Sequence, residues 1–313
     1  MDFKYVFGPV MSSRLGRSLG LDLLGDKICD FDCLYCEVGK TRVHTTTRKA
    51  YVPGDEIMRE LRAWFSQGHV PPDYITLGGM GEPCLNTDMG GIISRVKELY
   101  PHIPVAVLTN SSLLADPGVR EELTRADAVL PSLDTVVEKE FQHLNRPHPD
   151  IALSRILDGL IKFRKEFRGR IFLEILLVPG YNDSRENMQG LRDFCAGLSP
   201  DRVDLARMTR PGTYIRAPKT DAHIEDRWRE FLELKPQAER SEDENTREHG
   251  GIEVNKETVL ASLKRRPQTR EQLAYALEGT AAEIKNAVDE LLREGKLLEE
   301  QDLGTDKIFF SVR

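Results

Sequence analysis

Three cysteines crowd into one short stretch, CDFDCLYC, at Cys29, Cys33 and Cys36. Thiolates at this C-x3-C-x2-C spacing can hold three irons of a cubane cluster and leave the fourth iron open, whereas a purely electron-carrying cluster uses four thiolates. Cys84 and Cys195 stand alone, so the total of five cysteines is odd. An odd and tightly clustered set favours metal or redox chemistry over a disulfide framework.

Zinc is the alternative for the triplet, because zinc accepts three cysteines and a histidine, and His44 lies nearby in the sequence. The isolated cysteines have simpler interpretations. Cys195 falls on an apolar helical face and is expected to be buried packing. Cys84 follows a glycine-rich turn and is expected to be a small core residue, with a place in the pocket wall as the alternative.

A second group of candidates follows apolar, strand-like runs. The stretch GGMGEP supplies Gly78, Gly79, Gly81, Glu82 and Pro83. Ligands of open parallel sheets bind at the carboxyl ends of the strands. Bare glycine backbone there lets a charged amino acid moiety approach closely, although any tight turn also recruits glycine. Glu82 is expected either to contact the ligand or to brace the loop.

Three further polar residues, Asn110, Ser132 and Asp134, lie just past the next two strand-like runs. They are candidates for contacting a ligand at this edge of the sheet. Turn capping is the alternative for each of them.

The elements that must position these residues alternate between strands and helices. Strand-like runs with little polar alternation, typical of parallel strands covered on both faces, are Ser18–Leu24, Tyr74–Leu77, Val105–Leu108, Ala128–Leu133, Ile171–Val178 and Val203–Met208. Helical spacing of apolar residues lies between them, around Ile57–Phe65, Ile92–Tyr100, Ile156–Phe167 and Met188–Leu198. Pro149-Asp150 and Asn182-Asp183 are expected to open the last two helices.

Six strands alternating with helices predict right-handed βαβ units and a parallel sheet. The region is smaller than the ~250 residues typical of a closed eightfold barrel, so we expect a partial six-unit α/β barrel over residues 1–234. Residues 235–252 are charged and nearly free of large apolar groups, which predicts a linker. Residues 253–313 predict three helices and a hairpin, with capping boxes at Thr269/Gln272 and Thr280/Glu283 and a turn at Gly304. This order resembles a winged helix-turn-helix.

The cysteine spacing, with Tyr35 just before its last member, resembles the signature of the radical S-adenosylmethionine (SAM) superfamily. GGMGEP, the LTN that ends at Asn110 and the PSLD that contains Ser132 and Asp134 follow in that superfamily's order. FGPVMSSRLGRSLGLDLL, LLVPGYNDSREN and RPGT resemble segments of an uncharacterised subgroup near the wybutosine-synthesis and nitrogenase-cofactor-assembly branches. The resemblance covers about residues 7–231.

The resemblance implies a [4Fe–4S] cluster on the three cysteines, SAM chelated to the open iron, and Tyr35 near the adenine. It makes Asn110, Ser132 and Asp134 candidates for binding the ribose hydroxyls or the methionine carboxylate of SAM. It also implies reduction by a flavodoxin or ferredoxin, and a 5′-deoxyadenosyl radical that takes hydrogen from a substrate in the barrel mouth. The barrel must then exclude water and hold the radical near one C–H bond. Glu174 and Arg207, polar residues on otherwise apolar strands, are the candidate substrate contacts, with an internal ion pair as the alternative.

Charge and composition limit the partners. The net charge is −7 and no apolar stretch approaches 20 residues, so we expect no membrane span. The N-terminal sequence shows no signal-peptide pattern, and a cytoplasmic location is expected. Residues 253–313 carry ten Lys and Arg against twelve Asp and Glu, which disfavours duplex DNA and favours a protein or peptide partner.

The substrate therefore remains open between a peptide or protein and a small molecule. A tRNA substrate is less favoured, because the same charge balance disfavours it and no cysteines remain for a second cluster. The alternative function is an iron–sulfur transcriptional sensor that uses the C-terminal unit.

Overall fold

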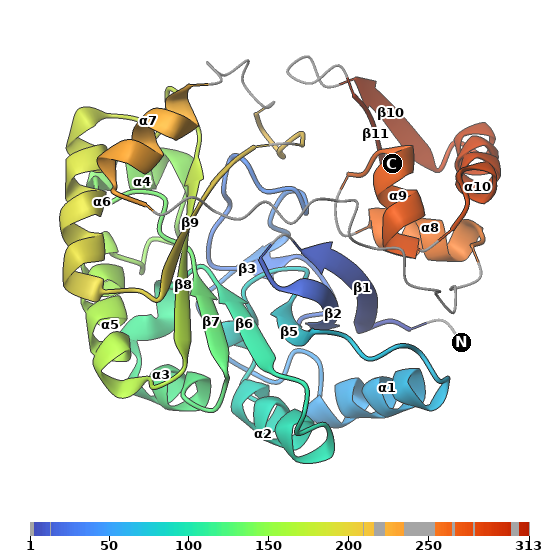
Figure 1. Ribbon diagram of the computed structural model, residues 1–313, viewed down its shortest axis with the longest axis horizontal. Helices are drawn as coiled ribbons and strands as arrows, with labels where there is room; N and C mark the ends of the chain where they lie inside the picture. Colours follow the sequence, from blue (N-terminus) through green and yellow to red (C-terminus); the bar gives the residue numbers. More distant parts are fainter. Residues whose placement is uncertain are drawn as a thin grey trace.

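The computed structural model describes residues 3–12, 14–208, 210–215, 223–234, 254–264, 267–277, 279–301 and 307–312. A seven-stranded sheet, in the order β1-β2-β5-β6-β7-β8-β9, forms its centre (Figure 1). Its strands are β1 (Val6–Ser12), β2 (Gly16–Asp22), β5 (Tyr74–Gly78), β6 (Val105–Thr109), β7 (Ala128–Pro131), β8 (Arg170–Leu177) and β9 (Arg202–Arg207). β3 (Ile28–Cys29) and β4 (Val43–His44) pair separately.

The six predicted strands are confirmed, and each pairs in parallel with its neighbour from β2 to β9. The sequence did not predict β1, which pairs antiparallel with β2. Its register is broken by an irregularity between Phe7 and Val10, around Gly8-Pro9. Glycine and proline interrupt a strand pattern, which hides β1 in the sequence.

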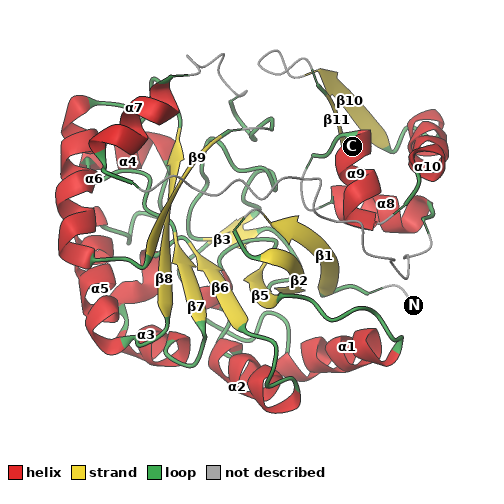
Figure 2. Cartoon of the chain, in the orientation of Figure 1, coloured by secondary structure: helices red, strands yellow, loops and turns green. Residues whose placement is uncertain are grey.

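Helices cover the outer face of this sheet (Figure 2). They are α1 (Gly54–Ser66), α2 (Met89–Leu99), α3 (Pro117–Leu123), α4 (Glu138–Leu144), α5 (Leu153–Glu166), α6 (Arg185–Leu198) and α7 (Ile224–Phe231), with the 3-10 turns η1 (Pro83–Leu85) and η2 (Ser112–Ala115). The four predicted helices are confirmed as α1, α2, α5 and α6. The N-caps are Ala152 and Ser184, so the start of α5 was predicted two to three residues too early and that of α6 one to two residues too early.

The inside of the sheet has a small apolar cluster of its own, built on Ala106, Ala128, Leu130 and Phe172. The main core lies between the strands and the outer helices. In the described residues β1 and β9 are the two edges, so the sheet is an open α/β wall. This mostly parallel sheet is consistent with the predicted partial barrel.

The C-terminal unit has the expected order of elements: α8 (Lys256–Leu263), α9 (Arg270–Leu277), α10 (Ala281–Arg293), and the antiparallel hairpin of β10 (Leu297–Gln301) and β11 (Ile308–Val312). Both predicted capping boxes form. The unit has its own core, and α9 packs against β1. The predicted linker and the turn at Gly304 lie outside the described residues, and the domain boundaries stay predictions.

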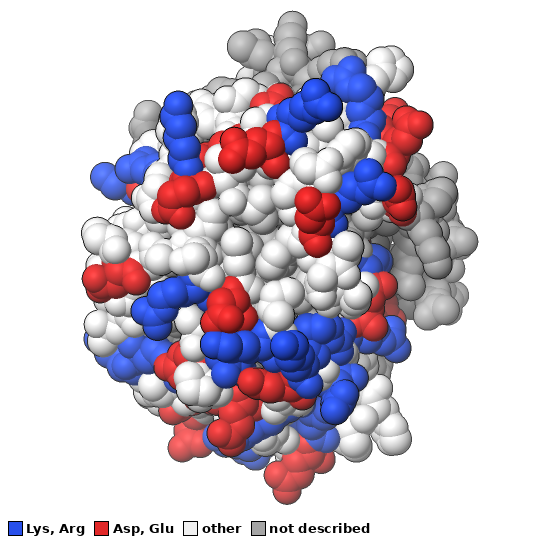
Figure 3. Space-filling model, turned by 90° about the vertical axis from the view of Figure 1, so that its left-hand side faces the viewer, with Lys and Arg blue, Asp and Glu red and all other residues white. Residues whose placement is uncertain are grey.

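The side of the molecule that carries α5 and α6 shows acidic and basic side chains interspersed (Figure 3). Several are paired across this surface, as in Lys162–Asp158 at 2.6 Å and Arg164–Asp201 at 2.9 Å. Among the described helices, none is long and apolar enough to cross a membrane.

Candidate functional site

The cysteine loop begins at the end of β3 and runs across the carboxyl ends of the parallel strands. Cys29 is buried, whereas Cys33 and Cys36 are half-buried, and all three are free thiols. Burial raises the pKa of the Cys29 thiol well above its usual range and that of Cys33 to about 12. Without a positive partner, these sulfurs would remain protonated thiols.

Each sulfur of the triplet has a side-chain N–H donor beside it. The donors are Asn110 Nδ2 to Cys29 Sγ at 3.7 Å, Asn145 Nδ2 to Cys33 Sγ at 3.8 Å, and Lys27 Nζ to Cys36 Sγ at 3.0 Å. Hydrogen bonds of this kind favour a negatively charged sulfur and tune iron–sulfur centres. The donor set therefore fits thiolate ligands.

Lys27 is one of the two donors that the sequence analysis missed, and Asn145 is the other. The Lys27 side chain is buried, and burial alone would lower its pKa. The pKa is nevertheless raised, because negative charge on Cys36 and Cys29 stabilises the ammonium. Its only signal in the sequence is a lysine two residues before the first cysteine, in GDKIC.

The RPGT segment, residues 210–213, follows β9, the last strand of the large sheet, and fastens the cysteine loop through hydrogen bonds. Thr213 donates to the Cys36 carbonyl oxygen from both its backbone N (3.0 Å) and its Oγ1 (2.6 Å). Tyr214 N donates to the Leu34 carbonyl oxygen at 3.0 Å. A Cβ at Gly212 would lie 2.7 Å from the Cα of Tyr35, so the close approach requires glycine.

Arg210 links this fastening to the C-terminal unit. Its Nη1 is 3.2 Å from the Glu37 carboxylate, just past Cys36, and its Nε donates to the Gln272 side chain at 3.4 Å. Gln272 also closes the capping box at the start of α9. One arginine thus contacts both the cysteine loop and the C-terminal unit.

The glycine-rich turn lies against the same loop. Gly79 has a φ of +122°, a conformation that side chains disfavour. Gly81 pairs with Ile28, the residue before Cys29, so closely that a Cβ would lie 1.7 Å from the Ile28 carbonyl oxygen. This turn therefore brings backbone directly against the start of the cysteine loop.

Glu82 braces the turn. Its carboxylate accepts hydrogen bonds from Cys84 N (3.0 Å), Thr109 Oγ1 (2.8 Å) and Asn110 N (2.7 Å). Burial raises the pKa of Glu82 to about 7. Of the two roles expected for Glu82, the structure shows these bracing bonds, and Pro83 begins η1 beside them.

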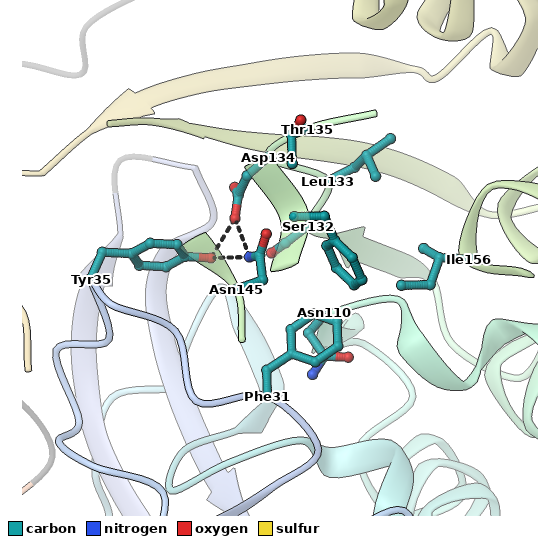
Figure 4. Close-up of a pocket in the computed structure, with 10 residues that line it drawn as sticks. Phe31, Tyr35, Asn110, Ser132, Leu133, Asp134, Thr135, Asn145 and Ile156 are labelled. Carbon is teal, nitrogen blue, oxygen red and sulfur yellow. Dashed lines mark hydrogen bonds between the residues drawn. The ribbon is translucent and has the colours of Figure 1, made fainter. Parts of the chain in front are cut away.

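Asp134 also has a structural network. Its carboxylate accepts from Tyr35 Oη at 2.5 Å, Asn145 Nδ2 at 2.8 Å and Leu176 N at 3.0 Å. Figure 4 shows Tyr35, Asp134 and Asn145 joined in this way at the wall of a pocket. The pocket is lined by Phe31, Tyr35, Asn110, Ser132, Leu133, Asp134, Thr135, Phe141, Asn145 and Ile156.

This pocket brings four predicted residues together: Tyr35, Asn110, Ser132 and Asp134. Asn110 also donates to the buried Asp30 carboxylate at 2.7 Å. Asn145 was not predicted, because it follows α4 in the stretch HLNRP, which carries no recognisable motif. Its side chain nevertheless contacts Cys33, Tyr35 and Asp134.

Glu174 and Arg207, the predicted substrate contacts, are not brought together. Glu174 pairs in register with Asp204, and Arg207 lies three residues further along β9, so strand alternation puts it on the opposite face. Arg207 instead faces Glu225 of α7 at 3.8 Å. Glu174 forms an internal ion pair with Arg14, from the loop between β1 and β2. We therefore correct the expectation for Arg207.

The remaining candidates are His44, Cys84 and Cys195. His44 Nε2 lies 3.1 Å from the Asp30 carbonyl oxygen. Among the described residues, no group of three His, Cys, Asp or Glu side chains is arranged so that it could hold a single metal ion. Cys84 is fully buried in the core, as expected, and Cys195 is only half-buried on α6.

Comparisons with known proteins identify a matching family and several similar proteins. The profile of the Radical SAM superfamily matches residues 27–191. A UPF0026 protein from Synechocystis is 38% identical over 67% of this chain and 77% of its own length. A Brachyspira hyodysenteriae protein named GTPase Obg is 32% identical over 95% of this chain, and the match spans 44% of that protein.

Among solved structures, Streptococcus suis SuiB bound to S-adenosylmethionine is similar at a TM-score of 0.49 and 21% identity. The match covers 68% of this chain and 43% of SuiB.

Proposed function

Because the chain belongs to the radical SAM superfamily, we propose that it is a radical SAM enzyme whose Cys29, Cys33 and Cys36 hold one [4Fe–4S] cluster. The cluster and SAM are the cofactors of this superfamily, and membership supports SAM-dependent radical chemistry. One observation carries the assignment to these three cysteines: each sulfur has its own N–H donor, from Asn110, Asn145 and Lys27.

The cluster, when bound, supplies the electron that splits SAM into methionine and a 5′-deoxyadenosyl radical. The chain's own residues bind SAM and orient it. The Gly78–Gly81 turn offers bare backbone to the amino acid end of SAM, as proposed from the sequence. The pocket beside Tyr35, Asn110 and Ser132 combines aromatic and polar walls, which suits a nucleoside.

Asp134 and Glu82 hold this frame in place, because their carboxylates are occupied by hydrogen bonds from neighbouring strands and loops. A rigid frame suits a reactive intermediate, since the pocket must exclude water and fix one C–H bond near the radical. Glu174 of β8, which pairs with Arg14 from the loop that follows β1, remains a candidate for the substrate end. The reaction on the substrate is proposed to be an oxidoreduction that begins with hydrogen abstraction.

The test is anaerobic reconstitution of the purified chain. We expect about four irons per chain, typical of one cubane, and slow release of 5′-deoxyadenosine with dithionite. Cys33→Ala should lose both iron and release. Cys195→Ala, at a half-buried position on α6, is the matched control and should retain both. Stoichiometric zinc without iron uptake would overturn the proposal.

The partners are proposed from charge and arrangement. A flavodoxin or ferredoxin is the proposed electron donor, and the subgroup near the wybutosine-synthesis and nitrogenase-cofactor-assembly branches is the proposed relative. The C-terminal unit, proposed to be a winged helix, carries four anions against two cations over residues 280–295. Such a surface favours a protein or peptide partner over DNA, whose phosphates need cations.

The proposed partner class has a direct test in the full-length chain. We expect no mobility shift of random duplex DNA even at low salt, where counterion release favours binding most. A tight, salt-sensitive shift would instead favour the iron–sulfur sensor.

A further inference from the structure

Lys27 occupies a position in which a lysine is rarely found. Its side chain is 6% exposed, and its Nζ lies 3.0 Å from Cys36 Sγ. Burying an ammonium group costs several kcal/mol unless a negative group compensates it. Within the described part of the chain no carboxylate forms an ion pair with Lys27, and the group that its ammonium faces is Cys36 Sγ.

The backbone delivers this side chain rigidly. Lys27 N donates to the Asp26 carboxylate at 2.8 Å, and its carbonyl oxygen accepts from Arg42 N (3.0 Å) and Val43 N (3.2 Å). The residue is thus fixed on both sides, immediately before β3 and two residues before Cys29. These bonds fix the backbone from which the Lys27 side chain reaches Cys36.

An iron–sulfur cluster at this loop would place negative charge beside Lys27. A [4Fe–4S]²⁺ core with three thiolates has a net charge of −1, and one added electron makes it −2. A neighbouring cation stabilises the reduced state more than the oxidised state, because the Coulomb energy scales with the product of the charges. Net charge, hydrogen bonds to sulfur and burial are the established determinants of cluster potential.

We propose that Lys27 is a positioning residue that acts as the counter-charge of the cluster and raises its reduction potential through Cys36. This inference rests on the proposed function. The step concerned is the transfer of one electron from a low-potential donor of the flavodoxin or ferredoxin class to the oxidised cluster, with no proton transferred and no bond broken. Lys27 makes this step more favourable without contacting the substrate.

The test is a potentiometric titration of the reconstituted full-length protein, followed by electron paramagnetic resonance of the reduced cluster. In Lys27→Met the ratio of reduced to oxidised cluster at a fixed potential should fall about tenfold, a shift of 59 mV for one electron. Lys27→Arg keeps the charge and should stay close to wild type. Lys97→Met is the matched control, because Lys97 pairs with Asp127 at the amino end of β7 and should leave the potential unchanged.

Each possible outcome tests either the inference about Lys27 or the proposed function. An unchanged potential in Lys27→Met overturns the inference while the cluster itself, and so the proposed function, stands. A wild-type chain that takes up no iron overturns the proposed function instead. If Lys27→Met loads no cluster but Lys27→Arg does, the charge is required and the inference is supported. If both variants fail to load, the site requires the shape of lysine, and the inference is wrong.

Discussion

Replacing Gly81 with alanine tests whether the glycine-rich turn supports the cysteine loop. The new Cβ would lie 1.7 Å from the Ile28 carbonyl oxygen and 2.7 Å from its carbonyl carbon. Both atoms are backbone, so no side-chain rotation relieves the contact. The two segments must separate by more than about 1 Å, because non-bonded atoms pack at roughly 3.5–4 Å. Separation also breaks the bond from Glu82 N to the Ile28 oxygen, now 3.2 Å long.

The expected destabilisation has two parts. Overpacking strain contributes about 1–3 kcal/mol, and the lost hydrogen bond about 0.5–1.5 kcal/mol. Together they predict a loss of about 2–4 kcal/mol in the free energy of unfolding. In a domain of this size that corresponds to a fall of roughly 5–15 °C in Tm. Because Ile28 precedes Cys29, iron occupancy should fall with the stability.

The assay is thermal unfolding of the apoprotein together with iron content after anaerobic reconstitution. Gly91→Ala is the matched control, because a Cβ at Gly91 in α2 meets no atom within 4 Å. It should be neutral or stabilising by up to about 1 kcal/mol, as expected for a helical glycine. If Gly81→Ala matches that control in both Tm and iron content, the turn does not support the loop and the reasoning fails.

Two further predictions concern the ion pair and the fastening segment. Burial raises the pKa of Glu174 to about 7, so the native state keeps a proton that the unfolded chain releases from about pH 4.5. As the pH rises from 4.5 to 7, the free energy of unfolding of the apoprotein should therefore fall by up to about 3 kcal/mol relative to that of Glu174→Gln. Denaturant unfolding measures this difference, and parallel pH profiles for the two proteins would contradict the prediction. Gly212→Ala should reduce iron occupancy by pushing on Tyr35, whereas Gly197→Ala, with open space at its Cβ, should not; equal occupancy in the two variants would refute the fastening role.

Local sequence patterns predicted most of the strands and long helices. The six parallel strands are apolar runs, and α1, α2, α5 and α6 carry apolar residues at helical spacing, so both were visible in the sequence. The short helices α3 and α4 were missed, because seven residues are too few to show a clear period. The start of α6 was placed too early because Asn182, which looks like a cap, is fully buried and bonds to the Asp134 and Leu176 carbonyl oxygens.

The candidate site also combines residues that local motifs predicted with residues that no local motif predicted. The cysteine spacing and GGMGEP are local motifs, and the structure brings them against each other at the start of the cysteine loop. The partners of these residues are not local. Asn145 lies 112 residues from Cys33, and nothing in the sequence joins them. The misplacement of Arg207 has a register cause, because a position on a strand shows its face only when the pairing of its neighbours is known.

The position of the RPGT segment in the sequence also determines when, during synthesis, the cysteine loop can complete its hydrogen bonds. The bond from Thr213 Oγ1 to the Cys36 carbonyl oxygen joins residues 177 positions apart. At about 5–20 residues per second, the ribosome completes the second partner roughly 10–35 s after the first. Throughout that interval Leu34 and Cys36 expose carbonyl groups that the finished barrel covers. Cluster insertion should therefore follow synthesis of the whole barrel, which would spare the nascent cysteines from premature loading.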